Sequence, residues 1–360
     1  MRAAGASTAP DGPKRTRLAL IGFGTVGQGF AQILAERGDA LAARHGLEVV
    51  VTAVSDFNRG SVYRAAGFDP RELLGAADAL ETLEADAKGW DALTTISESG
   101  ADAVAELSFT DLKTGEPALT HVREALSRGM DVITTNKGPI ALAFAELRKL
   151  AAEHGAGIGV EGTVMSGTPT LAVGAGMLAG AGVTRIQGIL NGTTNYILTR
   201  MEAGLDFDTA LAEAQREGYA EADPSGDVDG IDAAGKVVIL ANLVMDAPIT
   251  MADVERRGIR DVSAADVAAA AEAGERWKLI GSVERRADGG VSASVGPVRL
   301  PLAHPLAGVG GAVNACTFTT DLLGDVTIQG PGAGRLATGY ALVEDLIALR
   351  GRAPQGSGGR

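Results

Sequence analysis

The feature that most constrains the fold is a glycine-rich turn near the start of the chain. Residues 17–21 (RLALI) form an apolar run typical of a buried strand, and an amphipathic helical pattern follows the turn. Between them, Gly22, Gly24 and Gly27 have the spacing G-x-G-x-x-G, which permits a tight turn, close approach of a pyrophosphate, and packing of the helix on the strand. The candidate cofactor-binding residues of this turn are Gly22, Phe23, Gly24, Thr25, Val26 and Gly27.

A second strand completes the β-α-β unit and carries the residues that choose between NAD and NADP. Residues 48–56 (EVVVTAVSD) predict this strand, which ends at Asp56. An acidic residue here binds the adenosine ribose and favours NAD, whereas an arginine such as Arg59 accepts the 2′-phosphate of NADP. A solvated turn is an equally good interpretation of Arg59, and both cofactors stay open.

Strand and helix patterns alternate up to residue 160, which predicts a doubly wound parallel sheet. The run ADAVAELSFT predicts a buried strand that ends near Ser108 and Thr110, and DVITTNKGP predicts a strand followed by a turn at Lys137. Ligands of such sheets bind at the carboxyl ends of the strands, where these residues fall. A turn lysine is usually only solvated, but this location makes a substrate or nicotinamide contact at least as good an interpretation.

A further strand at residues 158–160 runs into the loop EGTVMSGTPT, which places Glu161 at the strand end. A carboxylate followed by exposed loop carbonyls suits a hard cation. A free loop carboxylate is the alternative, and composition alone favours it.

After residue 183 the pattern changes to a second, α+β domain. In GILNGTTNYIL, Asn191 and Gly192 form a strand-to-helix turn in which Thr193 can cap the helix and free amides could hold a carboxylate. Residues 275–329 predict strands of an antiparallel or mixed sheet. The run GPGAG then places Gly334 before a closing helix, which we expect to return to the dinucleotide-binding domain and cover the cofactor.

The segment from 231 to 245 predicts a helix that is buried almost all round, with Asp229 as its cap. Asp232 and Lys236 lie one turn apart on one face of it. An ordinary salt bridge near the surface is one interpretation. Because burial of an ion pair is costly and the flanking residues are apolar, we favour a functional pair. The acidic loop before this helix does not have the spacing of a calcium-binding EF-hand.

The composition excludes several classes of protein. A net charge of -13 and a pI near 4.9 argue against nucleic-acid and anionic-membrane partners, which require a basic surface. Cys316 is the sole cysteine, so no intrachain disulfide forms, which suits a reducing cytoplasm; its apolar surroundings indicate a core residue. We find no signal peptide, and the apolar run at residues 168–183 is too short for a membrane span.

Several of these runs together resemble homoserine dehydrogenase. They are GFGTVG, TTNKGP, EGTVMSGTPT, GILNGTTNYIL, YAEADPSGDVDGIDAAGK, HPLAGV and GPGAG, and they occur in the order and spacing of that family between Arg17 and Arg350. The run GILNGTTNYIL and the segment 221–236 are highly specific to the family, whereas the glycine fingerprint alone is common. The resemblance implies a short form, without the regulatory domain or the aspartokinase domain of longer members.

The resemblance implies NAD(P)-dependent interconversion of L-homoserine and L-aspartate 4-semialdehyde. Lys236 is then the proton donor and acceptor, Lys137 the second lysine that orients or polarises, and Asp227 the residue that fixes the lysine geometry. The implied substrate-binding residues are Glu221, Asp232, Asn191, Gly192 and Thr193. The implied cofactor contacts beyond the glycine turn are Asp56, Arg59, Ser108, Thr110, Lys137 and Gly334.

The resemblance also implies a monovalent cation, Na+ or K+, on Glu161 and on the carbonyls of Val164, Ser166 and Thr168. It further implies a homodimer or homotetramer formed through the second domain. A related dehydrogenase of another small amino alcohol or oxo acid, and a non-catalytic nucleotide-binding sensor, are the alternatives. The buried ionisable groups argue against the sensor, which would not need them.

The predicted fold is α/β, a Rossmann-type doubly wound dinucleotide-binding domain plus an α+β catalytic and dimerisation domain. The predicted ranges are a disordered N-terminus at 1–16, the dinucleotide-binding domain at 17–160, the substrate-binding and oligomerisation domain at 161–330, a returning helix at 331–352 and a disordered tail at 353–360.

Overall fold

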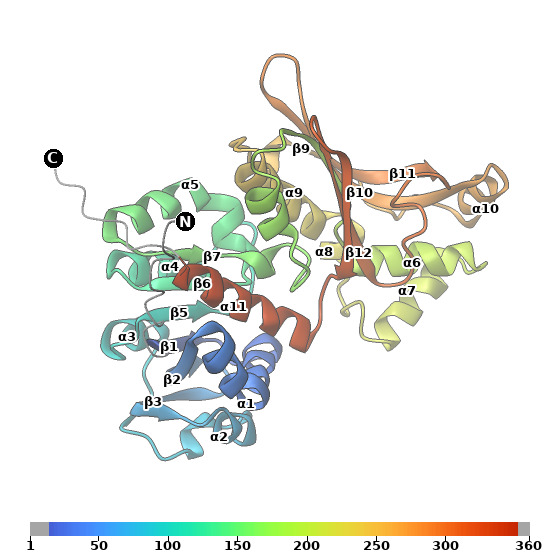
Figure 1. Cartoon of the computed structure of the whole chain (residues 1–360). Coiled ribbons are helices and arrows are strands. Elements are labelled where there is room, and N and C mark those ends of the chain that lie inside the picture. The colour runs from blue at the N-terminus through green and yellow to red at the C-terminus, as the bar shows by residue number, and fades with distance from the viewer. Residues whose placement is uncertain (1–13, 352–360) are drawn as a thin grey trace, which may run out of the picture.

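The structure, a computed structural model, describes residues 14–351. Within that range the strands form two sheets, one of seven strands and one of six (Figure 1). We call the seven-stranded sheet and the helices packed on it the first lobe, and the six-stranded sheet and its helices the second lobe. This mixture of a Rossmann-type lobe and a second sheet confirms the predicted fold class.

The first sheet has the order β4-β3-β2-β1-β5-β6-β7. The five strands β2, β1, β5, β6 and β7 run parallel to one another. Apolar side chains such as Leu18 and Leu20 of β1 are fully buried in the core of this lobe. The bounds are β1 (Lys14–Ile21), β2 (Leu47–Asp56), β3 (Gly60–Phe68), β4 (Ala87–Lys88), β5 (Ala103–Glu106), β6 (Asp131–Thr134) and β7 (Ile158–Gly159).

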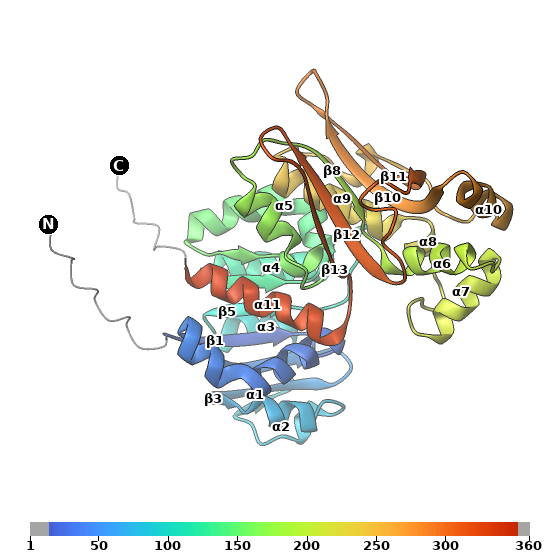
Figure 2. The same cartoon turned by 45° about the vertical axis from the view of Figure 1, so that its right-hand side comes forward.

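Helices cover both faces of this sheet (Figure 2). One face carries α1 and α11, which pack directly against each other, and the other carries α3, α4 and α5. The bounds are α1 (Thr25–His45), α2 (Pro70–Gly75), α3 (Ala92–Glu98), α4 (Ala118–Ser127), α5 (Lys137–His154) and α11 (Arg335–Arg350), with a short 3-10 helix at Leu80–Thr82. The closing helix therefore returns to the first lobe, as predicted.

Two elements of the first lobe differ from the purely parallel pattern that the sequence predicts. β3 pairs antiparallel with β2, and β4 pairs antiparallel with β3, so two antiparallel strands extend one edge of the sheet. Residues 14–16 belong to β1 and pair with β2, so the prediction of a disordered N-terminus was wrong for them. The rest of that segment and the predicted tail at 353–360 lie outside the described residues.

The second sheet has the order β13-β12-β8-β10-β11-β9, and all its neighbours are antiparallel except β9 and β11. It is thus the mixed sheet that the sequence indicated. The bounds are β8 (Val183–Ile189), β9 (Val254–Arg256), β10 (Glu275–Arg285), β11 (Val291–Pro301), β12 (Val313–Thr320) and β13 (Gly324–Pro331). Cys316 is buried in β12, where the thiol is free and burial raises its pKa.

The helices of the second lobe pack on one face of this sheet and against the first lobe. They are α6 (Gly192–Glu202), α7 (Phe207–Arg216), α8 (Ser225–Val228), α9 (Ile231–Val244) and α10 (Ala264–Glu272), with 3-10 helices at Glu161–Thr163 and Met251–Asp253 and a π-helix at Ala172–Met177. In α9 every residue from 233 to 241 is buried, as the sequence predicted.

The predicted cap of α9 was wrong. The N-cap is Gly230, which has a left-handed φ of 77° and provides no side-chain cap. Asp229 instead ends α8 and pairs with Arg260 at 2.6 Å. The short helix α8 takes up the residues before Gly230, so the chain enters α9 through a glycine turn.

None of the helices within residues 14–351 is both long and apolar enough to cross a membrane.

The contact between α1 and α11 depends on a glycine, which gives a test of the fold. A Cβ at Gly29 would lie 2.0 Å from the backbone oxygen of Arg335, so we expect Gly29→Ala to push α11 away and to lower the free energy of unfolding by about 1–3 kcal/mol. Gly38 lies in the same helix, and a Cβ there would have no atom within 4 Å, so Gly38→Ala should raise that free energy by about 0.5–1 kcal/mol. Urea denaturation measures the free energy of unfolding of both variants. Equal changes in the two variants would contradict the tight contact between α1 and α11.

Candidate active site

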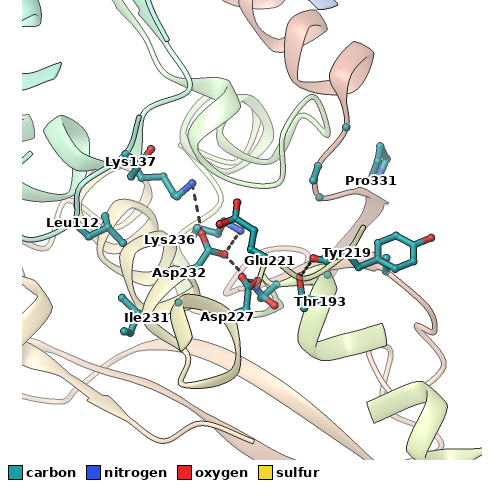
Figure 3. Close-up of a pocket in the computed structure, with 18 of the residues that line it drawn as sticks. Leu112, Lys137, Thr193, Tyr219, Glu221, Asp227, Ile231, Asp232, Lys236 and Pro331 are labelled. Atoms are coloured by element: carbon teal, nitrogen blue, oxygen red, sulfur yellow. Dashed lines mark hydrogen bonds and ion pairs between the residues drawn. The ribbon is translucent and has the colours of Figure 1, made fainter. Parts of the chain in front are cut away.

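Ten of the predicted site residues, from both lobes, line one pocket of about 1510 Å³ (Figure 3), whereas the glycine turn, Asp56 and Arg59 do not line it. The first lobe contributes the loop after β5 and the start of α5. The second lobe contributes the start of α6, the segment before α8 and the first turns of α9, and the connection from β13 to α11 forms part of the wall. The predicted residues that line the pocket are Thr110, Lys137, Asn191, Gly192, Thr193, Glu221, Asp227, Asp232, Lys236 and Gly334.

Lys236 and Asp232 form a close pair on the inner face of α9. Lys236 is only 7% exposed, and its Nζ donates to Asp232 Oδ2 at 2.7 Å and to the carbonyl of Leu190 at 2.6 Å. The other oxygen of Asp232 lies 3.5 Å from Nζ of Lys137, which comes from the first lobe. The alternative of an ordinary surface salt bridge was therefore wrong, because this carboxylate joins two lysines across the pocket.

The two lysines determine the charge of Asp232. Burial opposes its ionisation, but the positive charges of Lys236 and then Lys137 outweigh that effect and hold the pKa of Asp232 well below its usual range. The carboxylate is therefore ionised throughout the neutral range, and Lys236 faces a fixed negative charge.

Asn191 connects Asp232 to a second carboxylate. Its Nδ2 donates to Asp227 Oδ1 at 2.6 Å and to Asp232 Oδ2 at 3.0 Å. Burial, with a smaller contribution from the charge of Asp232, raises the pKa of Asp227. Because its hydrogen bond goes to Asn191, Asp227 acts on Lys236 through Asn191 and Asp232.

The turn before α6 is organised by Asn191 and not by Thr193. Asn191 is the N-cap of α6, and its Oδ1 accepts from the amide of Thr194 at 2.9 Å. Thr193 instead donates its hydroxyl to the carbonyl of Tyr219 at 2.7 Å, which ties the turn to the segment that carries Glu221 (Figure 3). Glu221 itself is exposed at the pocket.

On the first-lobe side, Asn136 orders the residues around Lys137. Its Oδ1 accepts from the amide of Gly138 and caps α5, and its Nδ2 donates to the carbonyls of Ser108 and Phe109 at 3.2 and 3.0 Å. The hydroxyl of Ser108 bonds to buried Glu106, so that side chain does not line the pocket. Asn136 was not predicted as a site residue, although an asparagine between a strand and a helix is the usual signal of a cap.

The glycine turn is closely packed at Gly22 and open at Gly24. Gly22 has a φ of 102°, and a Cβ there would lie 2.5 Å from the carbonyl oxygen of Leu107, so only glycine fits. Gly24 has no atom within 4 Å of a Cβ position, and as the N-cap of α1 it leaves the first amides of the helix without a side-chain cap. Free amides at a helix N-terminus next to open space suit a pyrophosphate.

Asp56 and Arg59 form an ion pair next to this turn. Asp56 accepts from the amide of Phe23 at 2.7 Å and from those of Asn58 and Arg59 at 2.9 and 3.1 Å. The Arg59 guanidinium lies 3.6 Å from the same carboxylate. Arg59 is therefore turned back towards Asp56, and is not merely a solvated turn residue.

The predicted cation loop gives Glu161 a different role. Its two carboxylate oxygens accept from the amides of Leu171 and Ala172 at 2.9 and 2.7 Å, so the side chain caps the helical segment that ends in the π-helix. This use does not favour Glu161 as a cation ligand. The carbonyls of Val164, Ser166 and Thr168 stay predicted ligands, and a dependence of the rate on K+ or Na+ would test them.

Several residues of the pocket were not predicted. Leu112 packs against Gly235 of α9, and Tyr219 lies against Tyr196 with ring centroids 4.7 Å apart. Seven more lie on the connection from β13 to α11, at the end of β13, or at or just before the start of β12: Ala312, Val313, Gln329, Gly330, Pro331, Gly332 and Ala333. Only the glycines of the GPGAG run carried a sequence signal for this wall.

Comparisons with known proteins agree with this geometry. Residues 22–161 match the family model described as "Homoserine dehydrogenase, NAD binding domain", and residues 169–347 match "Homoserine dehydrogenase". A relative named NAD(+)-dependent homoserine dehydrogenase, from Pseudomonas canavaninivorans, is 47% identical over 92% of this chain and 96% of its own. A homoserine dehydrogenase of Methanocaldococcus jannaschii is 37% identical over 92% of this chain and 97% of its own.

Solved structures lead to the same family. A homoserine dehydrogenase from Thiobacillus denitrificans has a TM-score of 0.82 and 32% identity over 93% of this chain and 73% of its own. A hyperthermophilic archaeal homoserine dehydrogenase in complex with NADPH has a TM-score of 0.80 and 32% identity over 94% of this chain and 98% of its own. The chain therefore belongs to the homoserine dehydrogenase family and is a nicotinamide-dependent oxidoreductase.

Proposed function

We propose that this pocket interconverts L-homoserine and L-aspartate 4-semialdehyde, with Lys236 as the group that moves the proton. The observation that carries the proposal is the pairing of buried Lys236 with Asp232 in a pocket shared by a glycine-turn lobe and a second lobe. A bound nicotinamide cofactor supplies or accepts the hydride. The chain itself must bind the amino acid, place the reacting oxygen and move one proton.

The proton step follows from the chemistry of the carbonyl group. Reduction of the aldehyde develops negative charge on its oxygen, and the ammonium of Lys236 donates a proton there; in the reverse direction the neutral amine accepts the proton of the hydroxyl. Lys137 places a second positive charge near that oxygen. Asp232 bonds to Lys236 and lies 3.5 Å from Lys137, so it sets the distance between the two amines.

The remaining polar groups suit the head of an α-amino acid. Glu221 and Asp232 offer negative charge to the ammonium. The start of α6 at Gly192 and Thr193 offers backbone amides and the positive end of a helix dipole to the carboxylate. Asp227 and Asn191 keep the carboxylate of Asp232 oriented. A pocket with both kinds of group recognises a zwitterion better than a simple alcohol.

For the cofactor, we propose that Gly22 to Gly27 hold the pyrophosphate and that Asp56 disfavours a 2′-phosphate, so NAD is the preferred cofactor. The proximity of Asp56 to the amide of Phe23 supports this proposal, as does the NAD(+)-dependent relative. Ser108, Thr110 and Gly334 are proposed to lie along the nicotinamide half. Initial rates with homoserine and either NAD or NADP test the whole assignment, and a faster reaction with another amino alcohol would favour the related-dehydrogenase alternative.

We also propose a cytoplasmic homodimer or homotetramer that assembles through the second sheet. β13 is an edge strand of that sheet, and the turn after β12 carries the exposed Leu322 and Leu323. An unpaired edge with apolar residues at its end invites pairing with a second copy. Light scattering of the purified protein should give a multiple of 36.5 kDa, and a monomer would refute the assembly.

Replacing Lys236 tests its role directly. Lys236→Met should lower kcat for homoserine oxidation by about 10²–10⁴-fold, because the proton has no acceptor, while the affinity for the cofactor stays nearly unchanged. Lys149→Met is the matched control, since Lys149 lies exposed in α5, where it pairs with Glu153 at 3.8 Å. Turnover by Lys236→Met at the rate of the control would overturn the assignment.

Asp232→Asn tests the electrostatics of the pair. The folded-state pKa of Asp232 is depressed, so its ionisation stabilises the protein above the unfolded pKa near 3.8, and this contribution is lost as pH falls towards the folded pKa. We expect the variant to lower the free energy of unfolding by about 1–3 kcal/mol at pH 7, and the difference should narrow below pH 4. Urea denaturation at several pH values checks this, and a pH-independent difference would contradict it.

A further inference from the structure

Asn314 of β12 is a fully buried amide without a hydrogen-bond partner. Its exposed fraction is 0%, and neither Oδ1 nor Nδ2 bonds to any residue between 14 and 351. Buried polar side chains are nearly always paired, because a desolvated donor or acceptor without a partner is costly. An amide with both atoms unpaired is therefore expected to gain a partner in another state of the enzyme.

The amide lies directly behind the pocket wall. A Cβ at Gly332 would lie 2.2 Å from its Oδ1 and 2.4 Å from its Nδ2, and a Cβ at Gly192 would lie 3.3 Å from Oδ1. Both glycines line the pocket, as does Val313 next to Asn314. Residues 331–334, here called the strap, join β13 to α11 and cover the amide from the pocket side.

We propose that Asn314 is a positioning residue that holds the strap over bound homoserine. In the occupied enzyme the strap shifts, and the backbone N–H and C=O of Gly332 pair with Oδ1 and Nδ2 of Asn314. This inference deepens the proposed function and rests on it, since homoserine is the ligand that the closed strap covers.

The chemistry of the two partners is complementary. Asn314 offers one acceptor and one donor side by side, and the N–H and C=O of a single extended residue point to the same side, as they do between paired strands. The substrate does not reach this amide, because Asn314 is fully buried and does not line the pocket. The backbone of a residue satisfies both Oδ1 and Nδ2.

Glycine is needed at position 332 for this approach. Any Cβ there would overlap the amide of Asn314, so a larger residue would hold the strap away. Gly334, at the other end of the strap, has a φ of 127°, a conformation that side chains other than glycine rarely adopt. The strap is thus built from residues that let its backbone move close to a side chain.

The strap is tied at Pro331 and its middle is not part of either flanking element, while α11 just beyond it is tied separately. The carbonyl of Pro331 accepts from Thr168 at 3.0 Å, and Thr338 in the first turns of α11 bonds to Ser166 at 2.8 Å. In Figure 3, Pro331 lies on the side of the pocket away from Lys137, with Asp232 and Glu221 between them. A small shift of Gly332 would therefore change the wall of the pocket that faces the acidic groups without moving either lobe.

The test compares Asn314→Leu with the unsubstituted enzyme. Leucine has nearly the same shape but no polar atoms, so the ligand-free variant should melt about 1–3 °C higher. The Asn314→Leu variant cannot hold the closed strap, so KM for homoserine should rise about tenfold. Its kcat should stay within twofold, because closure stabilises the bound substrate and the transition state equally. Melting curves without ligand and initial rates at saturating cofactor measure the two effects.

Asn195→Leu is the matched control, since Asn195 is also buried and its Oδ1 also has no partner among residues 14–351, but its Nδ2 donates to the carbonyls of Val309 and Val313. The Asn195→Leu variant should have a lower melting temperature than the unsubstituted enzyme. Should Asn314→Leu fail to fold, Gly332→Ala gives the second arm and should raise KM about tenfold with Asn314 intact. A lower melting temperature for Asn314→Leu, or an unchanged KM in whichever variant folds, overturns the proposal. An unsubstituted enzyme that does not oxidise homoserine counts against the proposed function instead, and the ligand-free melting comparison still decides whether the amide is unpaired.

Discussion

The carboxylate of Asp232 holds together two positive charges that come from different lobes. Lys236 reaches it from the same helix, and Lys137 reaches it from the start of α5. Burying a charge without a partner is far more costly than burying a pair, so each lysine depends on this carboxylate for its place. The distance between the two lobes at the pocket is therefore set by an ion triad, and the packing around it must keep α5 and α9 in register.

That packing is supplied by the segments that pass between the lobes. Asp345 of α11 accepts from the amide of Glu161, and Glu161 in turn caps the helical segment after its loop. A Cβ at Gly159 would lie 2.4 Å from Cβ of Asp345, so the last strand of the first sheet and α11 are in direct contact. Two chain crossings, the 161–168 loop and the strap, thus run side by side and are joined at Thr168 and Pro331. The two covalent connections between the lobes therefore meet at one place.

The parts of the fold that the sequence predicted are those with local signals. The glycine turn, the buried helix α9 and the strand-to-helix turn at Asn191 are each marked by a run of apolar residues. Beside each run stands a residue, such as glycine or asparagine, that is typical of one kind of turn or cap. The antiparallel strands β3 and β4 lacked such a signal, because β3 (GSVYRAAGF) does not alternate regularly between buried and exposed residues and β4 has only two residues. The cap of α9 was misassigned for a related reason: Asp229 is a good cap residue, but tertiary contact with Arg260 gives it a different partner.

Two asparagines at the pocket show which part of a residue's role the sequence can predict. Asn136 and Asn191 each follow a strand and cap a helix, on opposite sides of the pocket, and in each the Oδ1 accepts from a helix amide. Aspartate or serine would serve equally well as a cap. The NH2 group of the amide explains why asparagine is used. Nδ2 of Asn136 donates to the carbonyls of the loop after β5, and Nδ2 of Asn191 donates to Asp227 and Asp232. A carboxylate in either place could accept but not donate, and at Asn191 it would add a third negative charge beside two others. The cap is visible in the sequence, but the need for an amide follows only from what the fold brings to its other side.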